Sequence, residues 1–200
     1  MKKIIMAIAI LTMTTTAYAL DLDMAYNYGQ TIYSNSGQTF KGSDKNDKDW
    51  NGSTSQIEAT LWDKTLGVYA YYGSDNRVNE QMFKNLKYSN KIDFIGVGAK
   101  LKYRFFDCLD GYIGAGVNQT VMENTYTQIK KNKTKTIQED LRSFGPDVVV
   151  GVQWFPSENS GWFIGVNGRY SWNTVASTVY EGTDFSAPGL RYFGAVGYRW

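Results

Sequence analysis

Charged side chains recur at alternate positions of otherwise apolar segments, where they could form buried ion pairs. Lys100, Lys102 and Arg104 alternate with aliphatic or aromatic residues, and Glu58 and Asp147 are placed in the same way. A period of two puts such residues on one face of a β-strand. Because buried charges need partners, the sequence predicts an internal network of ion pairs. Its expected members are Asp23, Glu58, Lys100, Lys102, Arg104, Asp147, Arg169, Arg191 and Arg199.

Two contacts within this network follow from the positions of the residues along their strands. Asp147 and Arg169 lie at the same height on neighbouring strands, so we expect them to pair directly. Glu58 lies level with Lys100 and Lys102, and we expect it to meet one of these two lysines across the interior.

Residues 47–58 match the spacing of a calcium-binding loop, D-x-D-x-N-G-x5-E. The candidate ligands are Asp47, Asp49, Asn51, Ser53 and Glu58. No helical pattern flanks the segment, and Thr54 stands where such loops have an apolar residue. Glu58 is also an expected member of the ion-pair network, and its carboxylate cannot be both a calcium ligand and a partner of the interior cations. Apart from this possible Ca²⁺, no cofactor is expected.

A second polar segment, residues 129–137, is rich in lysine. The cations are Lys130, Lys131, Lys133 and Lys135. They could attract lipopolysaccharide phosphates or acidic host glycans. Alternatively, they form a solvated hairpin tip that lysine keeps soluble.

The composition argues against catalysis and against nucleic-acid binding. The chain has no histidine, the usual general base of hydrolytic sites, and no arrangement of Ser, Asp and Lys indicates an activated nucleophile. Its 21 basic residues exceed its 19 acidic ones only through Lys2 and Lys3. These two lysines precede an apolar run and the small-x-small site Ala17-Tyr18-Ala19, which together predict a cleaved signal peptide over residues 1–19 and a single domain over 20–200.

Eight strands are needed to position the charged residues. Alternation predicts them at about 21–33, 55–62, 66–73, 95–105, 112–118, 144–154, 162–172 and 190–200. In the third strand the inward face is ambiguous, because Tyr69, Tyr71 and Tyr72 fit either side. Short turns are expected at 63–65, 106–110 and 156–161, and they alternate with long polar segments at 34–54, 74–91, 123–140 and 174–189.

The face opposite the charges is apolar and ends in aromatic residues. The expected girdle residues are Phe144, Trp154, Trp162, Tyr170, Trp172, Tyr198 and Trp200. Trp162 and Trp172 bracket one strand, and such a span rises about 25 Å at about 3.3 Å per residue and a tilt near 40°. An apolar face of that height turned outwards indicates a barrel in a membrane. A soluble barrel would hide this face inside.

The last strand ends on Tyr198-Arg199-Trp200, with apolar residues at alternate positions before it. This ending resembles the C-terminal signal of Gram-negative outer-membrane β-barrels. With the signal peptide and the eight strands, the chain resembles the small eight-stranded outer-membrane proteins, such as the OmpA transmembrane domain, OmpX, OmpW and the opacity proteins. Its charged interior is more similar to that of OmpA or OmpX than to that of OmpW.

The resemblance implies an all-β, eight-stranded antiparallel up-and-down transmembrane β-barrel in the cell outer membrane. Its partners would be outer-membrane lipid, lipopolysaccharide and, during biogenesis, the barrel assembly machinery. Three functions remain open. The first is a non-enzymatic surface or structural role of long extracellular loops in adhesion, envelope integrity or defence evasion. The others are a narrow conduit for small solutes, which an interior packed with charges disfavours, and an enzyme that modifies lipid.

Overall fold

The computed structural model describes residues 20–33, 51–83, 86–130, 133–157, 160–172, 174–176, 184–186 and 189–200. Their regular elements are all strands. The strands are β1 (Asp21–Tyr33), β2 (Asn51–Asp63), β3 (Leu66–Phe83), β4 (Leu86–Phe106), β5 (Leu109–Lys130), β6 (Lys133–Trp154), β7 (Trp162–Ser171), β8 (Thr174–Ala176), β9 (Asp184–Ser186) and β10 (Gly189–Arg199). Among the described residues no helix is long and apolar enough to span a membrane.

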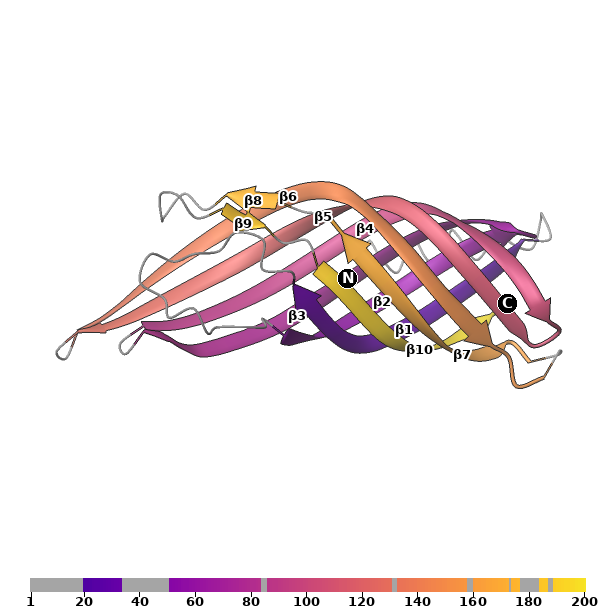
Figure 1. Ribbon diagram of the computed structural model, residues 1–200, viewed down its shortest axis with the longest axis horizontal. Helices are drawn as coiled ribbons and strands as arrows, with labels where there is room; N and C mark the ends of the chain where they lie inside the picture. Colours follow the sequence, from indigo (N-terminus) through magenta and orange to yellow (C-terminus); the bar gives the residue numbers. More distant parts are fainter. Residues whose placement is uncertain are drawn as a thin grey trace.

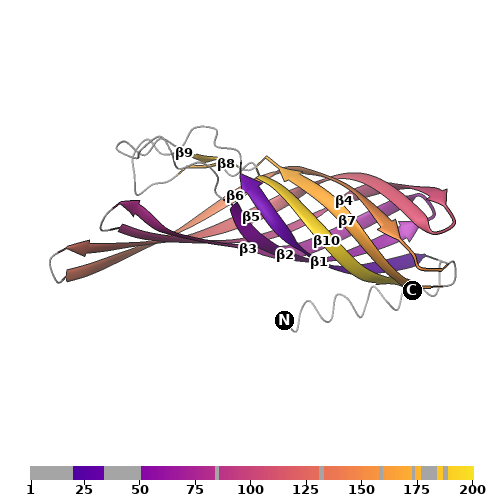
Figure 2. The ribbon, with the colours of Figure 1, turned by 60° about the horizontal axis from the view of Figure 1, so that its bottom comes forward.

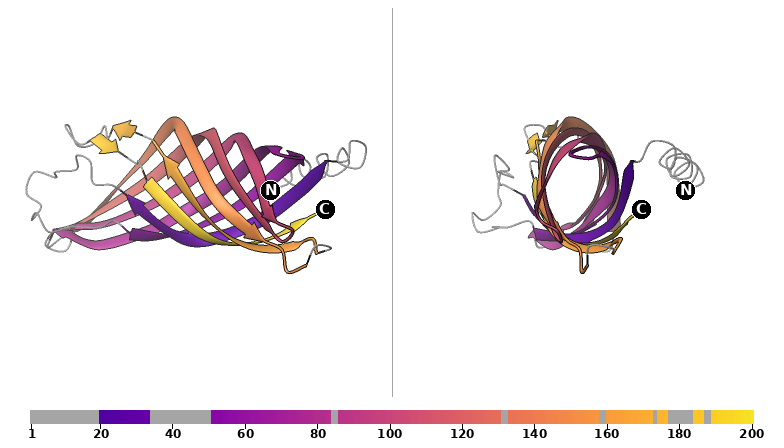
Figure 3. Two further views of the ribbon diagram at one scale, coloured as in Figure 1. Left: turned by 45° about the vertical axis from the view of Figure 1, so that its right-hand side comes forward. Right: turned by 90° about the vertical axis from the view of Figure 1, so that its right-hand side faces the viewer.

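Eight of these strands close into an antiparallel barrel in the order β1-β10-β7-β6-β5-β4-β3-β2. Seen along its axis, the barrel is a ring (Figure 3). The two remaining strands, β8 and β9, pair only with each other and lie beside β6 (Figure 1). The predicted eight-stranded antiparallel barrel is therefore confirmed.

The pairing register fixes the tilt of the strands. One row of paired residues runs through Leu22, Leu61, Val68, Ala99, Ala115, Val148, Tyr170 and Leu190 and meets β1 again at Ile32. A full circuit therefore ends ten residues further along β1, since 32 − 22 = 10. Eight strands with this displacement tilt by about 40° and enclose a backbone cylinder of about 8 Å radius.

The two ends of the barrel differ. The turns at Lys64–Thr65 and Asp107–Cys108 are shorter than the predicted turns 63–65 and 106–110, and we call this end the turn end. At the opposite end the β3–β4 and β5–β6 hairpins project far beyond the other strands, and we call it the hairpin end (Figures 1 and 2).

The polar segments at 74–91 and 123–140, predicted to be loops, are mostly strand. β3 and β4 run on to Phe83 and Leu86, and β5 and β6 run on to Lys130 and Lys133. Where a strand projects past the apolar outer wall of the barrel, neither of its faces has to be apolar. The alternation of apolar and polar residues therefore disappears, while the backbone hydrogen bonds between the strands continue. Residues 34–50 of the first long segment lie outside the described residues, and residues 51–54 belong to β2.

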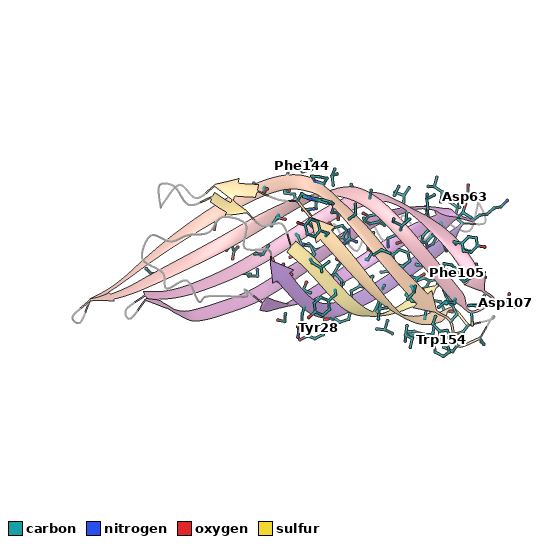
Figure 4. All side chains as sticks on the ribbon, viewed as in Figure 1. Tyr28, Asp63, Phe105, Asp107, Phe144 and Trp154 are labelled. Atoms are coloured by element: carbon teal, nitrogen blue, oxygen red, sulfur yellow. The ribbon has the colours of Figure 1, made fainter. Side chains whose placement is uncertain are left out.

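The outer wall of the barrel is an apolar belt with aromatic residues at both ends. Phe144 is 71% exposed on the side of the hairpin end, and Trp162 is 61% exposed at the turn end. The labelled side chains in Figure 4 show the same division, with Tyr28 and Phe144 on one side and Phe105 and Trp154 on the other. The inner wall carries the charged residues. The inward face of the third strand, which the sequence left ambiguous, is now defined: Tyr69 and Tyr71 point inwards, whereas Tyr72 is exposed.

Candidate functional site: a closed, charged barrel interior

Ion pairs occupy three levels of the interior. At the turn end, Arg199 Nε lies 2.6 Å from Asp23 Oδ1, and Arg199 Nη1 lies 2.8 Å from Asp110 Oδ2. Trp62 Nε1 donates to Asp23 Oδ2 at 2.8 Å. Since Asp23 belongs to β1 and Arg199 to β10, this turn-end group joins the first barrel strand to the last.

The central group is built around Arg169 of β7. Its guanidinium lies 2.5 Å from Asp147 Oδ2 and 2.8 Å from Glu58 Oε2. Glu58 also pairs with Lys100, and Tyr71 Oη donates to Asp147 Oδ2 at 2.6 Å. Two carboxylates thus balance two cations, and all four charged side chains are buried.

The hairpin-end group is centred on Asp75 of β3. Arg191 Nη2 lies 2.9 Å from Asp75 Oδ2, and Thr31 Oγ1 donates to Asp75 Oδ1 at 3.1 Å. Arg191 also donates to Ser171 Oγ at 3.2 Å, and its guanidinium lies 4.2 Å from the centre of the Phe94 ring. The group therefore connects β1, β3, β4, β7 and β10.

Aromatic rings fill the space between these groups. Trp62, Tyr69, Tyr71, Phe94, Tyr112 and Val149 form one buried cluster. Arg169 lies 3.7 Å from the centre of the Tyr71 ring, and Lys100 lies 4.4 Å from that of Tyr112. Water in a continuous channel would expose the residues that line it, yet Arg169, Lys100 and Tyr69 are at most 2% exposed. The described side chains therefore close the middle of the barrel.

Glycines make room for this packing. A Cβ atom on Gly96 would lie 2.5 Å from Tyr71 ring atoms, and one on Gly116 would lie 2.7 Å from Tyr69 Oη and 2.8 Å from Asp147 Oδ1. Real Cβ atoms do not approach so closely, so the Tyr71 ring lies directly on the backbone of neighbouring β4, and the Tyr69 hydroxyl reaches across to the backbone of β5.

The structure brings together the residues for which specific contacts were expected. Asp147 contacts Arg169, and of the two candidate lysines Glu58 contacts Lys100. Asp23, Arg191 and Arg199 also lie inside and make ion pairs.

Two expected members of the network are placed differently. Lys102 makes no ion pair with a described carboxylate, and its Nζ lies 4.5 Å from the centre of the Trp62 ring. Arg104 pairs with Asp110 at 2.7 Å, but its side chain is 52% exposed. The reason is that β4 extends past the β2–β3 turn, where Lys102 N donates to Thr65 O, so Arg104 lies at the mouth of the barrel.

Sequence reasoning missed the anions Asp75 and Asp110. Asp75 fell in a predicted loop and Asp110 in a predicted turn, whereas both are buried strand residues that pair with arginines. An available signal was the excess of cations: the predicted network had six cations and only three anions.

The calcium-loop prediction is wrong for the residues that the structure describes. Asn51, Ser53 and Glu58 lie in β2, an extended strand. The Glu58 carboxylate forms ion pairs with Lys100 and Arg169. A calcium loop curls around its ion, whereas alternate side chains of a strand point to opposite faces. Asp47 and Asp49 lie outside the described residues. No group of three His, Cys, Asp or Glu residues that could hold a metal ion occurs within the described part of the chain.

The expected girdle residues lie on the outer face. Trp162 packs edge-on against Tyr198 at 5.2 Å between ring centres, Tyr198 packs against Trp200 at 4.7 Å, and Tyr170 packs against Trp172 at 4.6 Å. Phe144 and Trp154 are exposed on β6.

The lysine-rich segment is the tip of the β5–β6 hairpin. Lys130 pairs with Lys133 and Gln128 pairs with Lys135, whereas Lys131 lies outside the described residues.

No protein-family model matches the chain, and no curated protein sequence matches it. Solved structures with the same architecture do. Neisserial surface protein A aligns with a TM-score of 0.56 at 14% identity, over 90% of this chain and 97% of that one. OprG from Pseudomonas aeruginosa aligns with a TM-score of 0.58 at 13% identity, over 90% and 95%. Ail of Yersinia pestis aligns with a TM-score of 0.54 at 13% identity, over 90% and 98%. The chain has the fold of the small eight-stranded outer-membrane β-barrels.

Proposed function

We propose that the chain is a non-enzymatic surface protein of a Gram-negative outer membrane, exported by residues 1–19 and inserted by the barrel assembly machinery. Its turn end faces the periplasm, and its β3–β4 and β5–β6 hairpins carry out adhesion, envelope stabilisation or defence evasion. The membrane location is supported by the apolar belt, which would be unstable in water. The short turns and long hairpins match the periplasmic and extracellular ends of such barrels.

The observation that carries the surface role is the contrast between a closed interior and long projecting strands. β6 runs on from Phe144 to Lys133, which places its tip roughly 25–30 Å beyond the girdle at about 3.3 Å per residue and a tilt of about 40°. The projecting parts of β3, β4, β5 and β6 form one continuous sheet. A sheet that the barrel does not need for closure is available for recognition.

The tip of this sheet favours an acidic partner. Lys130, Lys133 and Lys135 lie on paired segments of the β5–β6 hairpin, so a polyanion can approach several lysines at once. The competing interpretation is that the lysines only keep an exposed hairpin soluble.

The other two functions have less support. A solute conduit requires a path through the centre, and the described side chains close it. We therefore expect no resolved single-channel conductance from purified protein in planar bilayers. A lipid-modifying enzyme would need a base other than histidine, since the chain has none.

Shortening one hairpin at a time tests the surface role. Because Asn124 pairs with Glu139, residues 125–138 can be replaced by a two-residue turn without changing the register below them. The matched control replaces residues 80–87, between the paired Asn79 and Tyr88 of β3 and β4, by the same two-residue turn.

Both variants should keep the difference in gel mobility between unboiled and boiled protein that a folded barrel shows. Cells that express the β5–β6 variant should lose attachment to surfaces coated with acidic glycan, whereas the control should retain it. Equal attachment of the parent and both variants would show that the hairpins do not mediate recognition of the acidic glycan.

A further inference from the structure

One edge of β6 has no neighbouring strand over much of its length. β6 pairs with β5 from Lys133 to Trp154, but it pairs with β7 only from Asp147 onwards. Within the described part of the chain, residues 133–146 therefore have no ladder partner on the side away from β5. We call this stretch the free edge of β6.

Backbone groups on the free edge are available for hydrogen bonds. Trp172 N donates to Pro146 O, so Pro146 directs its carbonyl group towards β7. Alternate residues of a strand direct their N–H and C=O groups to the same side. The even-numbered residues of 134–144 therefore direct theirs to the free edge. An unpaired row of such groups is a template for another strand.

The small β8–β9 sheet lies beside only the part of this edge that is next to the barrel. Ala176, the last residue of β8, follows closely after Trp172, which is bonded to Pro146. At about 3.3 Å per residue, β8 can extend along β6 no further than about residue 142. In Figure 1 the β5–β6 hairpin continues well beyond β8. Residues 134–140 of the free edge therefore lie beyond β8.

The charges along the free edge are complementary to those of a second copy of the same edge. In an antiparallel pair, residues whose backbone groups are bonded lie opposite each other, so even-numbered residues must face even-numbered ones. A two-fold axis that passes through a residue meets this condition. An axis at Ile137 pairs residues 133–141 and puts Lys135 of each copy directly opposite Glu139 of the other. Opposite charges in directly opposed positions stabilise a strand pair.

Neighbouring registers match less well. An axis at Thr136 pairs Lys133 with Glu139, but it shortens the paired segment to residues 133–139. An axis at Gln138 forms no pair of opposite charges. An axis at Glu139 puts two glutamates opposite each other, which destabilises a strand pair. The charges therefore favour the register in which the axis passes through Ile137.

We propose that the free edge of β6 binds the free edge of a second copy of this chain, antiparallel and with the two-fold axis at Ile137. This proposal rests on the surface role of the hairpins given under the proposed function. Because the paired strands run in opposite directions, the two barrels lie at opposite ends of one continuous sheet, in two membranes that face each other. From Ile137 to Phe144 each strand descends about 18 Å, so the two apolar belts lie about 35 Å apart. The chain thus joins two membranes through contact between identical proteins.

The test uses phosphatidylcholine vesicles that carry the folded full chain, and light scattering measures their aggregation. Lys135→Glu and Glu139→Lys each put like charges opposite each other, so vesicles with either variant should aggregate about tenfold less than those with the parent. A mixture of the two kinds of vesicle restores both pairs of opposite charges and should aggregate like the parent. The matched control is Lys130→Glu, which makes the same change of charge outside the paired segment and should also aggregate like the parent.

A second measurement tests the register. Cys108 is the single cysteine of the chain, so Cys108→Ser gives a background without cysteine. In that background Ile137→Cys puts two thiols opposite each other at the axis, where Cα atoms about 4.5 Å apart allow a disulfide. Gln138→Cys is the control, because its two copies would lie about 8 Å apart, too far for a disulfide. Under oxidising conditions, Ile137→Cys should form a cross-linked dimer and Gln138→Cys should not.

Equal aggregation of the parent, the two single variants and their mixture would overturn the proposal, as would a parent that does not aggregate. Absence of the Ile137→Cys dimer would overturn the register, and dimers without vesicle aggregation would overturn the arrangement in two membranes. The difference in gel mobility shows that each variant is folded. Attachment of the Glu139→Lys variant to acidic glycan tests the proposed function separately, since this variant keeps all four lysines of residues 129–137.

Discussion

At the scale of single residues, the interior depends on charge balance. Arg169 has two carboxylate partners, and Glu58 has two cationic partners, so each holds together residues from three strands. Burial of such groups is tolerated because every charge has a partner at hydrogen-bonding distance. Removal of one member should therefore cost more than removal of a balanced pair.

The first prediction concerns Glu58→Gln. The substitution leaves Lys100 and Arg169 with only Asp147 as a buried counter-charge, and it should lower the free energy of unfolding by about 3 to 5 kcal/mol. Urea unfolding in lipid vesicles, followed by the change in gel mobility, measures this. In the double variant Glu58→Gln/Lys100→Met the balance is restored, and most of the loss should be recovered. Equal losses in the single and double variants would contradict the balance argument.

The second prediction compares two glycines. In Gly96→Ala the new methyl group meets the Tyr71 ring, which must move and give up its 2.6 Å hydrogen bond to Asp147. The expected cost is about 1 to 3 kcal/mol. Gly194 faces outwards, and the nearest atom to an added Cβ is the Tyr28 carbonyl oxygen at 3.9 Å. Gly194→Ala should therefore change the unfolding midpoint little, and similar shifts in the two variants would show that Tyr71 does not depend on close contact with Gly96.

At the scale of elements, the sequence is informative only where the membrane imposes a pattern. Within the belt, lipid requires an apolar outer face, so the alternation of Ile113 and Val117 with Tyr112 and Asn118 predicts the strand and its inner face correctly. Beyond the belt no such requirement exists, and β5 continues to Lys130 through a mostly polar segment in which apolar residues do not alternate regularly.

The interior was predictable in part for the same reason. Charges at alternate positions within the belt identified Glu58, Lys100, Asp147 and Arg169. Asp75 was missed because it falls in the segment taken for a loop. The role of Tyr69 and Tyr71 was ambiguous, since tyrosine suits both a lipid interface and a packed interior.

The third prediction concerns the projecting part of the β5–β6 hairpin. Its strands have no barrel interior to pack against, so they should open locally without unfolding the barrel. Hydrogen exchange should be fast for amides of residues 124–138 and slow for those of residues 112–118. Replacement of residues 125–138 by a short turn should then change the stability of the barrel by less than about 0.5 kcal/mol. Slow exchange throughout the hairpin would mean that other parts of the molecule support it.

At the scale of the whole molecule, the barrel is closed by β1 and β10. Asp23 pairs with Arg199 by register and by an ion pair, and Trp200 N donates to Leu22 O at 3.0 Å. The strands that close the barrel are the first and last to be synthesised, so closure depends on the completed C-terminal strand.

The fourth prediction concerns deletion of Trp200. Its exposed ring contacts Tyr198, so its loss from a folded barrel should cost no more than a few kcal/mol, the value for one large apolar side chain. If the terminal aromatic residue is part of the assembly signal, the deletion should nevertheless strongly reduce the amount of barrel in outer-membrane fractions. Protein refolded from urea into detergent should still show the mobility shift. Equal outer-membrane levels for parent and deletion would show that Trp200 is an ordinary interfacial residue.

The closing pair of strands has one more consequence. β1 and β10 meet as an antiparallel pair with continuous register, and they differ from a hairpin only in lacking a connecting turn. A short linker between the start of β1 and the end of β10 would supply that turn, and the chain could then be opened at Asp107–Cys108 without breaking any ladder. Such a circular permutant would retain every interior ion pair while β5 and β4 became the first and last strands. It would thereby separate the order in which strands are synthesised from the architecture that they build.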